Sequence, residues 1–190
     1  MPRPVLAALL IHLALAVPAL AAPIAYRLDP EASTVAFETD FGPDLITGSI
    51  PLAMADLRLD FDNAANSTIS VTLDVTGATA SFPFAAQALR GPKVLDAATH
   101  PQMTFESTLV TGAGETAEVT GNLTIRGVTR PATLLAQVFR PQGSDENDRS
   151  RLTVRLTGSV KRSDFGAAGW SDMVGDEVRI VITARIDAKG

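Results

Sequence analysis

The stretch Val178–Asp187, VRIVITARID, decides the fold class of this 190-residue chain. Apolar residues occupy every second position of it, and charged or hydroxyl-bearing residues fill most of the positions between. The apolar set is Val178, Ile180, Ile182, Ala184 and Ile186. A period of two is typical of a β-strand that turns one face to an apolar interior and the other to water. The β-branched residues favour the same conformation.

The same alternation recurs along the chain. Its apolar faces include Leu57, Leu59 and Phe61, then Ile69, Val71, Leu73 and Val75, then Leu152, Val154 and Leu156. Turn-forming residues separate such segments at Phe41–Asp44, Asp62–Asn66, Gly112–Gly114 and Arg126–Gly127, and the polar stretch Gln142–Ser150 predicts an exposed hairpin loop. The pattern therefore predicts an all-β domain. Whether it is a sandwich or a closed barrel stays open at this point.

One segment breaks the alternation. Ala85–Thr99, AAQALRGPKVLDAAT, is rich in alanine, and Gly91-Pro92 interrupts it. We expect one or two short helices here, lying across the strands or at the end of the domain. The chain shows neither an internal repeat nor a low-complexity tract, so a second domain is not expected.

The first residues predict export. Arg3 precedes the apolar run Val5–Val17, and Ala19-Leu20-Ala21 has the small-x-small pattern of a signal-peptidase site. The run is shorter than the roughly 20 residues that a membrane-spanning helix needs. We therefore expect residues 1–21 to be a cleaved signal peptide and residues 22–190 to form one exported domain without an integral membrane segment.

Composition excludes several classes of function. Cysteine is absent, which removes thiol nucleophiles, thiolate metal sites and disulfides. A net charge of −5 without a basic run argues against nucleic acid as a partner. His100 is the one histidine beyond residue 21, so neither a Ser-His-Asp triad nor a multi-histidine metal site is expected. We predict no catalytic residue, no metal site, no required cofactor and no enzymatic activity.

An acidic cluster has a structural interpretation. Asp56, Asp60 and Asp62 alternate with apolar residues, whereas a calcium loop places its carboxylates at alternate loop positions and adds a glycine. We therefore expect these carboxylates on the wet face of a strand.

Several sequence blocks, in a fixed order, resemble the YceI-like, lipocalin-like family of periplasmic polyisoprenoid-binding proteins. The most specific are Gly121–Thr129, GNLTIRGVT, and Lys161–Gly166, KRSDFG. Further blocks are Tyr26–Asp29, Ser33–Phe37, Thr47–Ile50, Leu89–Asp96 and His100–Ser107. Two positions depart from the family pattern. The family often has a histidine after the strand that contains Phe37, and this chain has Asp40 nearby instead. The family often has an aromatic pair in the helical insertion, and this chain has Val94-Leu95.

The resemblance implies an eight-stranded antiparallel lipocalin-like barrel with a short helical insertion. It also implies an amphiphilic isoprenoid lipid, of the polyprenyl or quinone type, held in the lumen by a periplasmic binding or carrier protein. Around the insertion, large apolar residues are the candidate ligand-binding set: Phe82, Phe84, Leu89, Leu95, Phe105, Phe165 and Trp170. Arg90, Arg126 and Arg162 are candidates for exposed rim residues that meet a head group.

Two other functions stay open on the sequence. The first is a non-catalytic structural or accessory barrel whose interior is filled by its own side chains; an open lumen would argue against it. The second is a small outer-membrane barrel, which the single Tyr and single Trp disfavour because such barrels carry aromatic girdles. The sequence also leaves a homodimer open.

Overall fold

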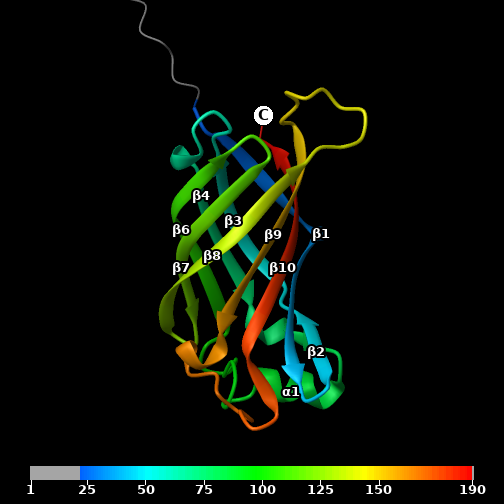
Figure 1. Ribbon diagram of the computed structural model, residues 1–190, viewed down its shortest axis with the longest axis vertical. Coiled ribbons are helices and arrows are strands. Elements are labelled where there is room, and N and C mark those ends of the chain that lie inside the picture. The colour runs from blue at the N-terminus through cyan, green and yellow to red at the C-terminus, as the bar shows by residue number, and fades with distance from the viewer. Residues whose placement is uncertain (1–21, 190) are drawn as a thin grey trace, which may run out of the picture.

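The computed structural model describes residues 22–189 and shows a twisted antiparallel barrel with α1 (Pro83–Arg90) at its lower end (Figure 1). The predicted signal peptide, residues 1–21, lies outside the described residues. The strands are β1 (Ile24–Phe41), β2 (Asp44–Ser49), β3 (Leu52–Leu59), β4 (Thr68–Asp74), β5 (Thr79–Ala80), β6 (Gln102–Ala113), β7 (Thr116–Ile125), β8 (Val128–Phe139), β9 (Arg151–Lys161) and β10 (Val174–Ala188). Three short 3-10 turns are Ala64–Asn66, Val75–Gly77 and Arg162–Phe165.

Eight of these strands form a closed ring. Successive antiparallel pairs run from β10 through β9, β8, β7, β6, β4 and β3 to β1, and β1 pairs again with β10. Closure leaves neither β1 nor β10 with a free edge along their shared length. The predicted eight-stranded antiparallel barrel is therefore confirmed, and the sandwich is excluded.

The long strand β1 has two different partners on its second side. Ile24–Tyr26 pairs with β3, whereas Ala36–Phe41 pairs with β2. Between these parts, Pro30–Ser33 forms a bulge opposite β10, where Asp29 faces Arg185 and Thr34 faces Thr183. Pro30 lacks the N–H that a strand ladder needs, and the bulge therefore lies at this position. After the bulge, β1 stays paired with β10 but has β2 in place of β3 as its other neighbour at the lower end of the barrel.

The predicted turns lie where the strands end. Phe41–Asp44 joins β1 to β2, and Gly112–Gly114 lies at the β6–β7 turn. Arg126 and Gly127 connect β7 to β8, and both have positive φ angles, of 53° and 72°. A two-residue hairpin turn of this kind requires positive φ at both positions, which explains the glycine. The polar stretch Gln142–Ser150 lies in the loop between β8 and β9 at the upper end.

The helical insertion contains one short helix, whereas the sequence allowed one or two. Pro83, favourable at a first helical position, starts α1 two residues before the expected segment. The helix ends at Arg90 because Pro92 disfavours the helical conformation at Gly91, whose φ and ψ are −73° and 168°. The remainder of the segment up to Thr99 consists of turns, so the second short helix is wrong.

The acidic cluster follows its predicted arrangement at Asp56, which is exposed on β3, but differs from it at Asp60. Asp60 is 8% exposed and lies just after β3, not on a wet strand face. Its carboxylate accepts hydrogen bonds from the Asn66 side chain and from the backbone N–H groups of Asp62 and Asn63. The Asn66 hydrogen bond is the main reason that the pKa of Asp60 is lowered. Asp60 therefore organises the β3–β4 turn.

One cluster of fully buried side chains lies in the upper half of the barrel. Tyr26 is 0% exposed and packs its ring edge-on to Phe61, with centroids 6.4 Å apart. Its hydroxyl donates a hydrogen bond to the Arg149 carbonyl oxygen at 2.8 Å. Leu152 and Ile186 complete this cluster. The β8–β9 loop is thereby tied to the first strand of the barrel.

Tyr26 supplies a test of this packing. Burial raises its pKa from 10 to about 12, because the charged phenolate would lose its water, although the nearby Arg149 charge opposes the shift. The neutral phenol thus stabilises the fold below pH 10, and we expect this stabilisation to fall by roughly 2 kcal/mol as the pH rises from 10 to 12. Since Tyr26 is the only tyrosine, the phenolate absorbance reports its titration directly. The control is the guanidinium-unfolded chain, which should titrate near 10; a midpoint near 10 in the folded protein would contradict the buried position.

Candidate functional site

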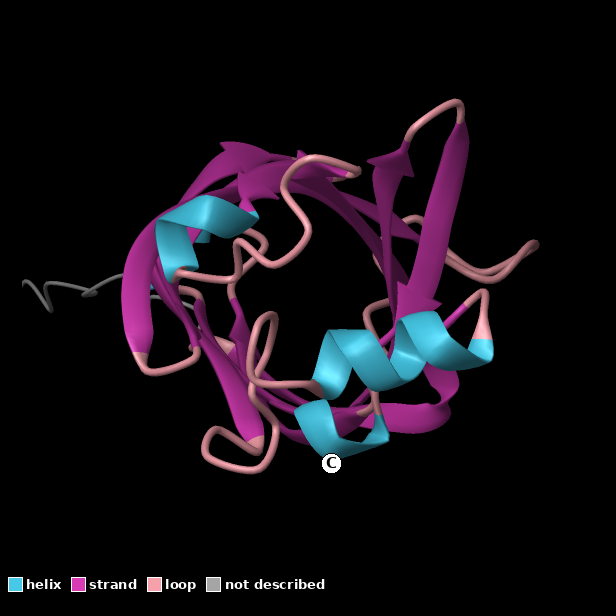
Figure 2. Cartoon of the chain, turned by 90° about the horizontal axis from the view of Figure 1, so that it is seen from below, coloured by secondary structure: helices cyan, strands magenta, loops and turns pink. Residues whose placement is uncertain are grey.

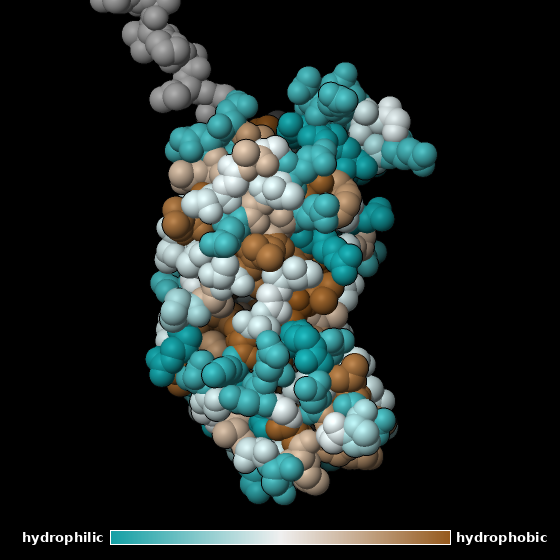
Figure 3. Space-filling view, viewed as in Figure 1, coloured by the Kyte–Doolittle hydropathy of each residue, from teal (hydrophilic) through white to brown (hydrophobic). Residues whose placement is uncertain are grey.

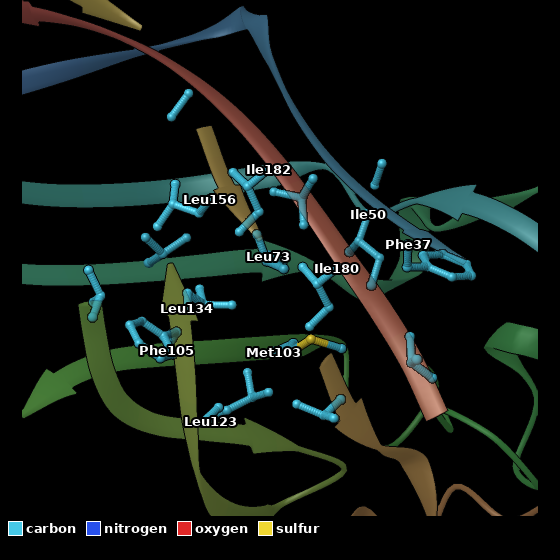
Figure 4. Close-up of a pocket in the computed structure, with 18 of the residues that line it drawn as sticks. Phe37, Ile50, Leu73, Met103, Phe105, Leu123, Leu134, Leu156, Ile180 and Ile182 are labelled. Atoms are coloured by element: carbon cyan, nitrogen blue, oxygen red, sulfur yellow. The ribbon is translucent and has the colours of Figure 1, made fainter. Parts of the chain in front are cut away.

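The barrel encloses an apolar cavity of about 630 Å³. Figure 4 shows its central part, where branched and aromatic side chains from strands around the ring point toward one another. The labelled residues are Phe37, Ile50, Leu73, Met103, Phe105, Leu123, Leu134, Leu156, Ile180 and Ile182. A volume of this size lies within the range of pockets that hold small organic ligands. The interior is therefore not filled by the protein's own side chains.

Strand alternation builds this lining. On β8, Leu134 faces the cavity and is 7% exposed, whereas its neighbour Leu135 faces outward and is 60% exposed. On β10, Ile180 and Ile182 line the cavity, with the outward Arg179 beside them. Because side chains alternate between the two faces of a strand, each ring strand contributes a row of apolar groups to the lumen.

All seven predicted ligand-binding residues line the cavity wall: Phe82, Phe84, Leu89, Leu95, Phe105, Phe165 and Trp170. Their environments differ. Leu95 and Phe165 are 7% and 2% exposed and belong to the packed core around the lower part of the lumen. Phe82 and Phe84 stack with centroids 5.9 Å apart at the start of α1. That these side chains contact a ligand remains a prediction.

Apart from Phe105, the predicted set misses the middle of the lumen. Leu73, Leu134, Leu156, Ile180 and Ile182 line it, and all are strand residues. The period-two alternation identifies most of them as inward-facing. The alternation does not distinguish an inward side chain that packs against others from one that borders open space. That difference depends on the side chains of the opposite strands.

Arg162 is not an exposed rim residue as predicted. It is 7% exposed, and its guanidinium donates to the carbonyl oxygens of Ala167, Gly169, Val174 and Gly175 at 2.6 to 2.9 Å. Burial lowers its pKa, because the cation has lost most of its water. Arg162 therefore fixes the loop between the 3-10 turn Arg162–Phe165 and β10 against the end of the barrel.

Arg90 and Arg126 also stabilise chain segments at the lower end. Arg90 donates to the Ala78 carbonyl oxygen at 2.9 Å. Arg126 donates to the carbonyl oxygens of Val94 and Gly166 at 3.0 and 2.6 Å. These hydrogen bonds hold the turns after α1 and the loop before β10 next to each other. Here, as in the case of Arg162, the arginine partners are backbone carbonyls.

Groups for acid–base or metal chemistry do not converge in the described part of the chain. His100 lies before β6, next to the Gly127 turn, and none of the hydrogen bonds found between residues 22 and 189 joins its ring to a serine or a carboxylate. Within the same residues, histidines and carboxylates form no group of three that would hold a metal ion. Nor do residues 22–189 include a helix long and apolar enough to cross a bilayer.

A narrow apolar lumen in an eight-stranded ring agrees with the similarity of the chain to known proteins. The YceI-like domain matches residues 26–186. The chain belongs to the YceI-like family. It is 31% identical to a UPF0312 protein of Pectobacterium carotovorum over 83% of both chains. It is also 32% identical to the YceI protein of Salmonella arizonae, over 65% of this chain and 64% of that one.

Two solved structures share the architecture. BcnA of Burkholderia cenocepacia superposes with a TM-score of 0.75 and 26% identity, over 84% of this chain and 99% of that one. A polyisoprenoid binding domain from Saccharophagus degradans, implicated in plant cell wall breakdown, superposes with a TM-score of 0.64. It covers 87% of this chain and 99% of the domain, and at 15% identity it demonstrates the common fold.

Two substitutions on β10 compare the packing around a side chain beside the cavity with the packing around a side chain in the buried cluster. Ile180 and Ile186 both lie on the inner face of β10, but Ile186 is 1% exposed and packed in the cluster around Tyr26, whereas Ile180 remains partly exposed beside the cavity. Ile186→Phe should cost about 1–3 kcal/mol of unfolding free energy, because it overpacks a filled region, and Ile180→Phe less than about 1 kcal/mol. Urea unfolding of both variants measures the difference; equal losses would show that the centre of the barrel is as tightly packed as its upper end.

Proposed function

We propose that this chain is a periplasmic binding or carrier protein for a long isoprenoid lipid, of the polyprenyl or quinone type, whose chain lies in the barrel lumen. The observation that supports this most directly is the apolar cavity of about 630 Å³, lined by strands all around the ring. The isoprenoid class is supported by the Saccharophagus degradans domain of the same fold, which is described as polyisoprenoid-binding. A binding role without catalysis agrees with a site made of hydrocarbon side chains.

Tight binding in such a site needs few polar contacts. Each CH₂ group that leaves water contributes roughly 0.8 kcal/mol, so a chain of tens of carbons has far more gross transfer energy than a tight complex requires. The entropy lost in ordering the flexible chain and the imperfect contact with the wall offset much of this transfer free energy. Shape and hydrocarbon content of the lumen then decide which chains bind.

The competing role, a structural or accessory barrel with a side-chain-filled interior, has less support. It requires the inner faces of the strands to meet, and in the ring they border a cavity instead. An accessory role without any ligand remains the outcome of a negative binding experiment.

A charged side chain introduced into the lumen tests the binding site. We expect Ile180→Asp to weaken binding of a polyprenol and of a long-chain quinone at least tenfold, because the ligand would strip water from an unpaired carboxylate. Leu135→Asp is the control, since Leu135 faces outward and does not line the cavity. Both variants are checked by circular dichroism and then titrated with each lipid dispersed from ethanol. Wild-type protein that binds neither lipid contradicts the proposal; if Ile180→Asp stays folded and binds both normally, the ligand does not lie in the central lumen.

The periplasmic location is tested separately. It is supported by the signal-like residues 1–21, so the exported chain should begin at Ala22. Intact-mass measurement of the protein from a periplasmic fraction of the native bacterium gives the N-terminus, with a version lacking residues 2–21 as the cytoplasmic control. Full-length chain in the cytoplasm would contradict the export proposal.

A further inference from the structure

Exposed apolar side chains concentrate at the lower end of the barrel. In residues 22–189, nine large apolar side chains are exposed. Five belong to segments at this end, and we call them the rim: Leu45, Phe82, Phe84, Trp170 and Met173. Phe84 is 72% exposed although it is one of the largest side chains of the protein. Four of the five also line the cavity, so the rim continues the lumen surface outward to solvent.

The segments that carry the rim are tied to one another. Three backbone hydrogen bonds join them: Gly42 N to Met173 O (3.3 Å), Ser81 N to Thr47 O (2.7 Å) and Gly169 N to Lys93 O (3.0 Å). The β1–β2 hairpin, the loop before β10, the turns after α1 and the segment before α1 therefore hold the rim as one fixed surface. Figure 2 shows these loops and α1 around the end of the barrel. Because the backbone of these segments is already fixed, a partner that covers the rim does not have to order it.

The two ends of the barrel differ in chemistry. Cavity-lining residues also reach the upper end, where Leu59 and Phe61 belong to the packed cluster around Tyr26 and the β6–β7 turn contributes the small or polar residues Gly112–Thr116. The neighbouring β8–β9 loop is polar along Gln142–Ser150 and is hydrophilic in Figure 3. An apolar ligand that leaves the cavity at the lower end passes over exposed hydrocarbon, whereas at the upper end it meets the packed cluster around Tyr26 and then the polar turns.

We propose that the rim docks on the surface of a lipid bilayer, so that the lower end of the lumen faces the hydrocarbon from which a lipid enters. This inference rests on the proposed lipid-binding function. Continuity between cavity and rim favours a bilayer over another protein, because an apolar chain then moves between two hydrocarbon phases without crossing water. The exposed residues also match the types found at membrane interfaces, where aromatic rings and aliphatic side chains insert below the head groups.

Charge at the rim specifies the kind of bilayer. Asp44 adjoins Leu45 and Asp172 adjoins Met173, while the Lys93 ammonium lies 5.6 Å from the centre of the Trp170 ring. The other cations of this end are engaged within the protein, since Arg90 and Arg126 donate to backbone carbonyls. A chain with a net charge of −5 therefore gains little from anionic head groups. Docking is therefore apolar, and zwitterionic phosphatidylcholine vesicles should bind at least as well as vesicles that contain phosphatidylglycerol.

The test uses vesicles without any isoprenoid. Full-length mature protein is floated with phosphatidylcholine vesicles, and Leu45→Asp is compared with Leu135→Asp. Leu45 belongs to the rim but does not line the cavity, and Leu135 is a leucine on the barrel wall that is even more exposed. Leu45→Asp should reduce the vesicle-bound fraction at least about fivefold, since it replaces an inserted aliphatic group by a carboxylate. Leu135→Asp should leave it unchanged. Phe84→Asp should reduce it further.

Two further readouts complete the experiment. Quenching of Trp170, the only tryptophan, by phosphatidylcholine with brominated acyl chains should accompany flotation. Isoprenoid binding from an ethanol dispersion should be the same for Leu45→Asp as for wild type, because that assay involves no bilayer. Wild type that floats but binds no isoprenoid refutes the proposed function and leaves the docking surface standing.

Three results overturn the docking proposal. The first is wild-type protein that does not float with either vesicle. The second is equal loss of flotation in Leu45→Asp and Leu135→Asp. The third is a dimer, detected by light scattering, that dissociates on Leu45→Asp while neither form floats, because the rim would then be an interface between two copies of this chain.

Discussion

The pairing of β1 with β10 is the interaction on which the rest of the structure depends. It joins the first and last strands of the domain over most of their length, from Tyr26 opposite Ala188 to Phe41 opposite Val174. Without it the eight strands would form an open sheet, and one face of that sheet would expose its whole row of apolar side chains. Closure converts that face into a lumen. The same constraint sets the width of the lumen, because the diameter of a barrel grows with its number of strands.

β1 also determines how the two ends of the barrel differ. At its N-terminal part it pairs with β3 and carries Tyr26, whose ring and hydroxyl anchor the upper end. After the bulge at Pro30–Ser33, it pairs with β2 and leaves the lower end to α1 and the loops around it. Backbone carbonyls in those loops would lack partners so close to the lumen. Arg90, Arg126 and Arg162 provide donors for several of them.

Sequence patterns predict the elements of this protein better than their mutual packing. Val178–Ile186 identifies its strand because a period of two has one structural interpretation, and Arg126-Gly127 identifies a hairpin turn because few residues tolerate positive φ. The family resemblance adds closure into eight strands. The burial of Arg162 is not predictable in the same way, since its partners are carbonyls of a loop whose path depends on the finished barrel. The open lumen is likewise a property of side chains from eight strands together.

The bulge in β1 has a consequence for how the chain folds. Ser33 accepts a hydrogen bond from the Arg185 N–H across 152 residues of sequence, so this contact closes nearly the whole domain. The other ring strands pair mostly with neighbours in sequence and can assemble as hairpins. Loop-closure entropy makes distant contacts slow to form, and we expect the β1–β10 seam to complete folding. Until then two long strand edges stand unpaired, and crowded chains at this stage would associate edge to edge rather than each into its own ring.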